Sequence, residues 1–183
     1  SCTFEEKKSK FIAFLVPFEI FDDVMAKLRD EHPKARHFVY AYRYLNEFGQ
    51  IVENSSDDGE PKGTSGKPSL AVLSGAQIIN SAVIIVRYFG GVKLGTGGLV
   101  RAYADSVNEV IKIALFKKYQ KLITKTLVCD YTELSKLEYL INQENIHIKT
   151  KEFSTQINLT IELSIEQFKD LETKLSRNII ILS

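Results

Sequence analysis

The sequence predicts an α+β protein built from two small domains, residues 1–116 and 117–183. The chain has 183 residues, of which 44% are hydrophobic and 26% charged, and no biased tract interrupts it. Such a composition is typical of a folded globular protein that is long enough to form two cores. The hydrophobic pattern changes after a polar stretch, KKYQK at 117–121, and this change places the boundary between the domains.

Strands and helices are expected to follow one another along the first domain. Strands are predicted where β-branched and aromatic residues gather, over residues 11–16, 37–45, 50–53 and 81–86. Helices are predicted where apolar residues recur every three or four positions, over residues 20–31, 68–77 and 98–116. Cys2 is expected to lie in a mobile terminus. Strands combined with helices at these positions predict a two-layer α/β domain.

The second domain shows the order strand, helix, strand, strand, helix, strand. The strands are predicted over residues 122–128, 146–153, 155–163 and 179–182, and the helices carry the apolar stripes of residues 134–141 and 168–175. Ser164 and Gln167 have the spacing of a capping box at the start of the last helix. The order βαββαβ predicts a ferredoxin-like domain.

Charge and cysteine content exclude several classes of protein. Lys and Arg number 24 and Asp and Glu number 23, so the net charge indicates neither a nucleic-acid nor a membrane partner, and a charged site must be local. Cys2 and Cys129 form no CxxC pair, so neither a disulfide framework nor a zinc site is expected. The sequence does not start with a charged stretch followed by an apolar one, so no leader is expected. Its apolar runs fall far short of the roughly 20 residues that cross a membrane. A cytoplasmic protein without a membrane partner is therefore expected.

A glycine-rich turn, RYFGGVKLGTGGLVR at residues 87–101, is the first candidate site. It follows a buried strand and opens a helix, where backbone N–H groups attract anions. Arg87, Lys93 and Arg101 add positive charge, and Tyr88 and Phe89 offer faces for a stacking base. The turn does not match the dinucleotide pattern, because position 100 is valine, and Gly66-Lys67 does not match Walker A, because Pro68 follows it.

A purely structural role is the alternative for this turn. In that interpretation the glycines only permit tight turns. Thr96 would cap the helix, and Arg101 would pair with Asp105 one helical turn later.

The loop of residues 54–67 is the second candidate site, because it lacks apolar residues and is rich in turn formers. Asp57, Asp58 and Glu60 could hold magnesium, although such a cluster is more often a solvated turn. His37 could form an acid-base pair with Asp57 or Asp58 if the loop folds over its strand. No motif places a nucleophile, so no catalytic residue, metal or cofactor is assigned.

Three stretches together resemble a known family: ARHFVYAYR at 35–43, SDDGEPKGTSGKP at 56–68 and VIIVRYFGGVKLGTGGLVRAY at 83–103. They are similar to the IMPACT/YigZ family, with residues 4–116 as the IMPACT domain and the remainder as the small C-terminal domain of bacterial members. Ser65 departs from the usual alanine. The resemblance implies a first domain similar to domain IV of elongation factor G and a second similar to its domain V, both of which meet the ribosome.

The resemblance and the motifs define one expected ligand-binding surface. It comprises His37, Asp58, Glu60, Thr64, Gly66, Arg87, Tyr88, Phe89, Gly90, Gly91, Lys93, Gly95, Thr96, Gly97, Gly98 and Arg101.

The leading functional hypothesis is a non-enzymatic, translation-linked regulatory protein that binds RNA or a ribosomal surface through its first domain. Two alternatives stay open. One is a magnesium-dependent enzyme acting on a phosphate-bearing small molecule. The other is a protein-protein interaction module that acts through the sheet of the second domain.

Overall fold

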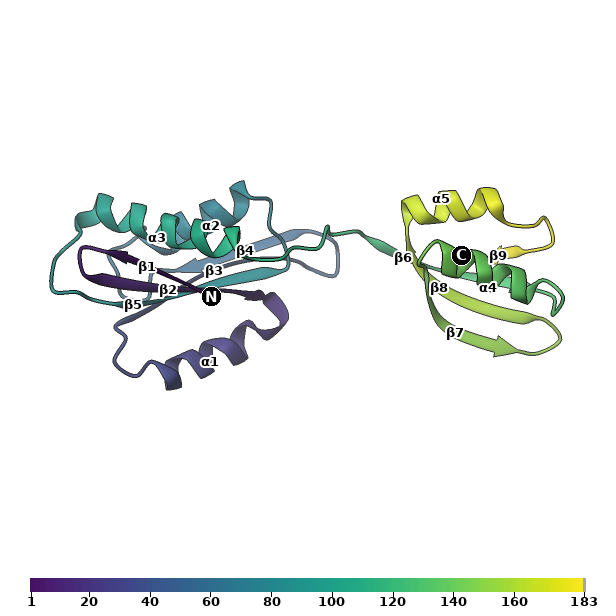
Figure 1. Cartoon of the computed structure of the whole chain (residues 1–183), viewed down its shortest axis with the longest axis horizontal. Helices are drawn as coiled ribbons and strands as arrows, with labels where there is room; N and C mark the ends of the chain where they lie inside the picture. The colour runs from purple at the N-terminus through teal and green to yellow at the C-terminus, as the bar shows by residue number, and fades with distance from the viewer. Residues whose placement is uncertain (183) are drawn as a thin grey trace. The chain divides into compact units, whose positions relative to one another are not determined.

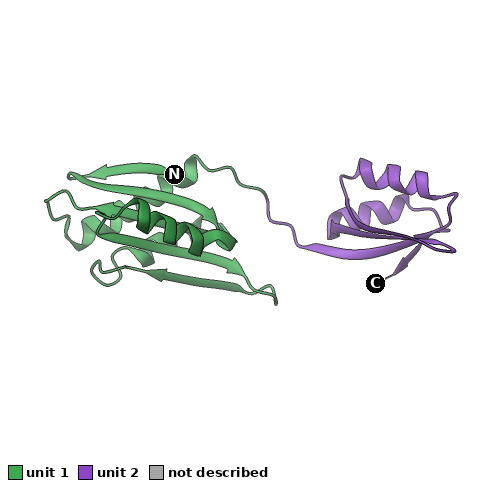
Figure 2. Ribbon diagram, turned by 90° about the horizontal axis from the view of Figure 1, so that it is seen from below, with its two compact units in different colours: residues 1–117 green, residues 118–183 purple. Residues whose placement is uncertain are grey.

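The computed structural model describes residues 1–182 and divides the chain into two compact units, Ser1–Lys117 and Lys118–Ser183 (Figure 2). Each unit contains one antiparallel sheet with helices packed on it, five strands in the first and four in the second. The predicted α+β class is therefore confirmed. Among the described residues, no helix combines the length and the apolar character needed to span a membrane.

The sheet of the first unit has the strand order β1-β2-β5-β3-β4. Its strands are β1 (Cys2–Glu6), β2 (Ser9–Pro17), β3 (His37–Leu45), β4 (Ile51–Ser56) and β5 (Ser81–Tyr88). The central strand β5 is buried at every position from Ala82 to Arg87. Apolar side chains therefore leave β5 on both faces, and each face needs its own cover.

Helices supply that cover on both sides of the sheet (Figure 1). On one face, α2 (Gly66–Gly75) and α3 (Gly95–Lys112) enclose a core that includes Phe11, Ile85 and Tyr103. On the other face, α1 (Phe21–Glu31), preceded by the short helix η1 (Phe18–Ile20), packs Phe21 and Leu28 against Ile84. The first unit thus has one layer more than the two that the sequence predicted.

The strand register brings several segments of the first unit to one end of the sheet. Arg87 of β5 lies opposite Phe11 of β2 and also opposite His37 of β3. The starts of β2 and β3 therefore meet the end of β5, and the loop after β4 leaves the sheet at the same end, because Ser56 pairs with Tyr40. Residues distant in sequence are thereby gathered around the end of β5.

The turn between β1 and β2 reaches the same place. A side chain at Gly90 would lie 2.0 Å from the backbone carbonyl of Lys8, so only glycine permits this approach. The amide of Gly90 also donates to the hydroxyl of Ser9 at 3.3 Å. The glycine-rich turn is thus held against the β1–β2 hairpin.

The second unit has the predicted ferredoxin-like arrangement, with strand order β7-β8-β6-β9. Its elements are β6 (Leu122–Cys129), α4 (Leu134–Gln143), β7 (His147–Phe153), β8 (Ile157–Ser164), α5 (Ile165–Lys174) and β9 (Ile180–Leu182). The capping box is confirmed, because Ser164 accepts from the amide of Gln167 at 3.1 Å and Gln167 accepts in return at 2.9 Å.

Several predicted boundaries were wrong. Sequence patterns did not predict the strand β1, because only every second residue of this strand is half-buried. Cys2 lies in β1 and not in a mobile end. Helix α2 begins at Gly66 instead of Pro68. Helix α3 begins at Gly95 and ends at Lys112, short of Phe116. Leu94 precedes α3 without a side-chain cap, so Thr96 is not the capping residue.

We expect Gly90→Ala to destabilise the first unit by about 1–3 kcal/mol, because the added methyl group would collide with the Lys8 backbone. The matched control is Gly97→Ala in α3, where no atom lies within 4 Å of the added carbon. This control should leave stability unchanged or raise it by up to about 1 kcal/mol through helix propensity. Urea unfolding followed by circular dichroism measures both, and equal stability of the two variants would contradict the close approach.

Candidate functional site

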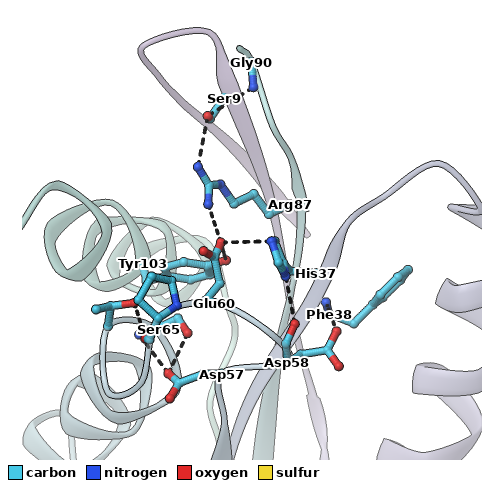
Figure 3. A network of polar contacts seen from close by, with 12 residues as sticks. Ser9, His37, Phe38, Asp57, Asp58, Glu60, Ser65, Arg87, Gly90 and Tyr103 are labelled. Carbon is cyan, nitrogen blue, oxygen red and sulfur yellow. Dashed lines mark hydrogen bonds and ion pairs between the residues drawn. The ribbon is translucent and has the colours of Figure 1, made fainter. Parts of the chain in front are cut away.

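A cluster of buried polar side chains joins the 57–65 loop to the sheet (Figure 3). We call it the Glu60 cluster; it consists of Glu60, Arg87, Tyr103, His37 and Ser9. Glu60 Oε1 accepts hydrogen bonds from Arg87 Nη1 and, at 2.8 Å, from the Tyr103 hydroxyl. The side chains of Glu60 and Arg87 are only 4% and 6% exposed. Glu60 is thus a loop residue whose charge is neutralised inside the protein.

Arg87 is held from several sides. Its Nη2 donates to the hydroxyl of Ser9 at 3.3 Å. Its guanidinium lies over the ring of Phe11 at 5.3 Å and near that of Phe89 at 5.7 Å. The expected role of Arg87 in ligand binding stays a prediction, and the structure shows its charge buried and paired with Glu60.

Tyr103 acts as a permanent hydrogen-bond donor to Glu60. Burial and the neighbouring Glu60 carboxylate raise the pKa of Tyr103 above its usual range. The phenol consequently keeps its proton, and its O–H stabilises the buried carboxylate.

His37 links the loop to the start of β3. Its Nδ1 lies 2.8 Å from the Asp58 carbonyl, which can only accept, so Nδ1 carries the proton of this bond. Its Nε2 faces Glu60 Oε1 at 3.8 Å. His37 therefore contacts backbone and carboxylate of the same loop, but Asp57 and the Asp58 carboxylate are not its partners.

Asp58 anchors the other side of the loop. Its backbone has a positive φ of 41° and is followed by Gly59 at 85°. Its carboxylate accepts from the amide of Phe38 at 2.6 Å and from Arg29 at 3.4 Å. Because of this turn, the Asp58 side chain contacts both the strand β3, through Phe38, and the helix α1, through Arg29.

Asp57 organises the loop from within. Its carboxylate accepts from the amides of Gly63, Ser65 and Gly66 at 2.7, 3.1 and 2.8 Å. The hydroxyl of Ser65 adds a fourth bond at 2.7 Å, which the usual alanine would lack. Asp57 therefore caps the N-terminus of α2.

The loop is also packed closely against the sheet. A side chain at Gly66 would lie 2.8 Å from the backbone of Ser56, and Thr64 donates its hydroxyl to the Pro61 carbonyl at 2.7 Å. Gly66 and Thr64 are both buried. Within the predicted surface, Gly66 and Thr64 thus hold the loop in its conformation against the sheet.

The three acidic residues of the loop point to three different sets of partners. Asp57 binds loop amides, Asp58 binds Phe38 and Arg29, and Glu60 binds Arg87 and Tyr103. Within residues 1–182, no three His, Cys, Asp or Glu side chains come together as a set of metal ligands. Each of the three carboxylates is therefore engaged by a different part of the protein.

The glycine-rich turn itself forms the exposed part of the site. Gly91, Lys93, Gly95, Thr96, Gly97 and Arg101 are exposed, and Phe89 is 43% exposed. Gly98 packs on Leu94, and Tyr88 bonds to His32 at 2.9 Å on the face covered by α1. Arg101 and Asp105 form no ion pair in the described chain.

Exposed cations surround this turn, and the sequence revealed only part of them. We call Lys8, Arg36, Lys93 and Arg101 the basic rim. The backbone of Lys8 touches Gly90, and the amide of Arg36 donates to the Arg87 carbonyl at 3.1 Å. All four side chains are exposed, and none forms an ion pair within residues 1–182. Lys8 and Arg36 were missed because strand register, not sequence proximity, brings them to the turn.

We expect Arg87→Ala to cost about 3–5 kcal/mol of stability, because it leaves the Glu60 carboxylate buried without its ionic partner. Tyr103→Phe is the matched control, since it removes one hydroxyl from the same carboxylate and should cost about 1 kcal/mol. Native-state hydrogen exchange at the amides of β5 reports both changes in the full chain. An Arg87→Ala protein as stable as Tyr103→Phe would contradict a buried ion pair.

Acid should loosen the 57–65 loop through Asp57. Burial raises the pKa of Asp57, but the bonds from Gly63, Ser65 and Gly66 outweigh it and hold this pKa below the ordinary 3.8. The stabilisation by Asp57 is therefore complete above pH 3.8 and declines as pH falls through the lowered pKa. NMR chemical shifts of the Gly63 and Gly66 amides should report this titration. Asp57→Asn should abolish it, and an unchanged titration in that variant would contradict the assignment.

Comparison with known proteins matches both units to family models. Residues 7–111 match the Impact N-terminal domain, and residues 127–178 match a domain of unknown function, DUF1949. An IMPACT family member of Haemophilus influenzae is 38% identical, and YigZ of Escherichia coli is 35% identical; each match covers 94% of this chain and 86% of the relative. A crystal structure described as that of a hypothetical protein is 34% identical, covers 100% of this chain and 92% of its own, and superposes with a TM-score of 0.67. The resemblance noted in the three sequence stretches thus extends over nearly the whole chain, which belongs to the IMPACT family.

Proposed function

We propose that the protein acts in translation as a non-enzymatic regulator that binds RNA or a ribosomal surface through the basic rim of its first unit. The observation that carries this proposal is a group of exposed cations without ionic partners in the described chain, placed around an exposed glycine turn. Cations that no carboxylate of the protein neutralises are available to phosphates.

The backbone and an aromatic side chain favour the same ligand. Helix α3 begins at Gly95 without a side-chain cap, and Gly95, Thr96 and Gly97 are exposed, so an anion has access to the positive end of the helix dipole. Phe89, 43% exposed, lies in the turn that precedes this helix and offers a ring on which a base could stack. Phosphate and base contacts are therefore available on one surface.

The enzymatic alternative has less support. It required Asp57, Asp58 and Glu60 to hold magnesium, but each of these carboxylates already accepts hydrogen bonds from the protein. The interaction-module alternative has one observation in its favour. On the sheet face of the second unit that the core does not use, Leu122, Ile180 and Leu182 are 49%, 53% and 47% exposed.

Removing two cations of the rim should weaken RNA binding without disturbing the fold. Lys93→Ala combined with Arg101→Ala should lower the affinity and reduce the slope of log K against log salt by about 1–2, since each phosphate contact contributes about 0.7–0.9. Fluorescence anisotropy with labelled RNA at several salt concentrations measures both quantities.

The control is Lys27→Ala on α1, which removes an exposed lysine that pairs with Glu31. It should leave both the affinity and the salt slope close to those of the unaltered protein. If the double variant binds RNA with unaltered affinity and slope, the basic rim is not the binding surface.

A further inference from the structure

A second basic region follows helix α3, outside the site described above. Residues 110–129 contain five lysines and no Asp or Glu, in a chain whose net charge is only +1. Residues 113–121 of this region, IALFKKYQK, form neither helix nor strand, and we call them the connecting segment. The positive charge of this stretch is therefore local, and three of its five lysines, Lys117, Lys118 and Lys121, lie in the connecting segment.

The connecting segment exposes aromatic and aliphatic side chains between its lysines. Leu115 is 102% exposed, Phe116 50% and Tyr119 51%. Lys117, Lys118 and Lys121 are exposed as well. These lysines form no ion pair within residues 1–182. Large apolar side chains gathered in solvent are typical of an interaction surface, and unpaired cations between them select an anionic partner.

A hollow of the first unit lies beside the start of this segment. It has a volume of about 480 Å³, and its lining includes the end of β2, Val110 of α3, and Phe116 and Lys117 of the segment. This volume falls within the roughly 300–1,000 Å³ of ordinary ligand pockets. The base of a nucleotide could therefore lie against Phe116, with the phosphate of the same nucleotide near Lys117.

We infer that the connecting segment binds single-stranded RNA, with bases stacked on Phe116 and Tyr119 and phosphates paired with Lys117, Lys118 and Lys121. This inference rests on the proposed function only in taking RNA as the ligand; the residues are different. Exposed aromatic rings interspersed with cations are typical of surfaces that bind single strands, because every base has a face to stack and every nucleotide a phosphate.

Two other anionic partners fit the segment less well. An anionic membrane surface binds helices that gather apolar side chains on one face, whereas residues 113–121 form no helix. An acidic protein would use the lysines but has no specific need of two aromatic faces. Stacking on Phe116 and Tyr119 therefore distinguishes the three partners.

The decisive variant replaces Phe116→Leu and Tyr119→Leu in the full chain, which keeps apolar bulk and removes the aromatic faces. Binding to a 12-nucleotide oligouridine should weaken at least about fivefold, whereas binding to a duplex RNA of the same length should not change, because its bases are already stacked. Phe153→Leu, which alters a 59% exposed aromatic residue of the second unit, is the matched control and should have no effect.

A charge variant, Lys117→Gln with Lys118→Gln and Lys121→Gln, tests the phosphate contacts. The slope of log K against log salt for oligouridine should fall by about 2, because each of the three lost phosphate contacts contributes about 0.7 for a single strand. An unchanged slope would overturn the inference.

The remaining outcomes separate this inference from the proposed function. If the leucine variant binds oligouridine as the unaltered protein does, while Lys93→Ala with Arg101→Ala weakens RNA binding, the inference fails and the proposed function stands. If the leucine variant loses nothing and the lysine variant instead loses binding to polyglutamate or phosphatidylglycerol vesicles, the segment serves an acidic protein or a membrane. If the unaltered protein binds no RNA, both proposals fail.

Discussion

The ion pair between Glu60 and Arg87 is the interaction on which the end of the first unit depends. Arg87 ends the central strand of the sheet, and Glu60 lies in a loop without regular structure. A pair that is so deeply buried gains little net stability, because both charges lose their hydration. It does fix the geometry, since Arg87 has no ionic partner other than Glu60 within residues 1–182 and the loop cannot leave the sheet without leaving the Arg87 charge unpaired inside the protein. Tyr103 donates a further hydrogen bond to Glu60, and Ser9 accepts one from Arg87.

This pair divides the residues of the predicted ligand-binding surface into two groups with different surroundings. His37, Glu60 and Arg87 form the interior support, and their chemistry is consumed by contacts within the protein. Lys93 and Arg101 remain in solvent, on a turn that Gly90 holds against the β1–β2 hairpin. The polar residues that look most reactive in the sequence are thus the scaffold, and the plain exposed cations beside them are free to meet a ligand.

Local patterns were sufficient to predict most of the architecture. The alternation in the second domain and the Ser164–Gln167 spacing depend on neighbours in sequence, and both predictions are confirmed. The site was predicted less well, because its contacts join residues far apart: Ser9 and Arg87 are separated by 78 positions. No local pattern reveals that an arginine beside a glycine turn will be buried by a glutamate from another loop. The same limitation hid Lys8, which reaches the turn only through strand pairing.

The error at the end of α3 has a different cause. Apolar residues continue at helical spacing beyond Lys112, so periodicity predicts that the helix continues, yet Ile113, Leu115 and Phe116 are 61%, 102% and 50% exposed. Periodicity records that a position favours an apolar side chain, but not whether this side chain packs within the chain or faces a partner. Within the described residues these side chains gain little from burial, so stability of the first unit does not account for their apolar character. The RNA strand proposed above accounts for the exposed ring of Phe116, because a base would cover this ring and the phosphates would pair with the lysines that follow.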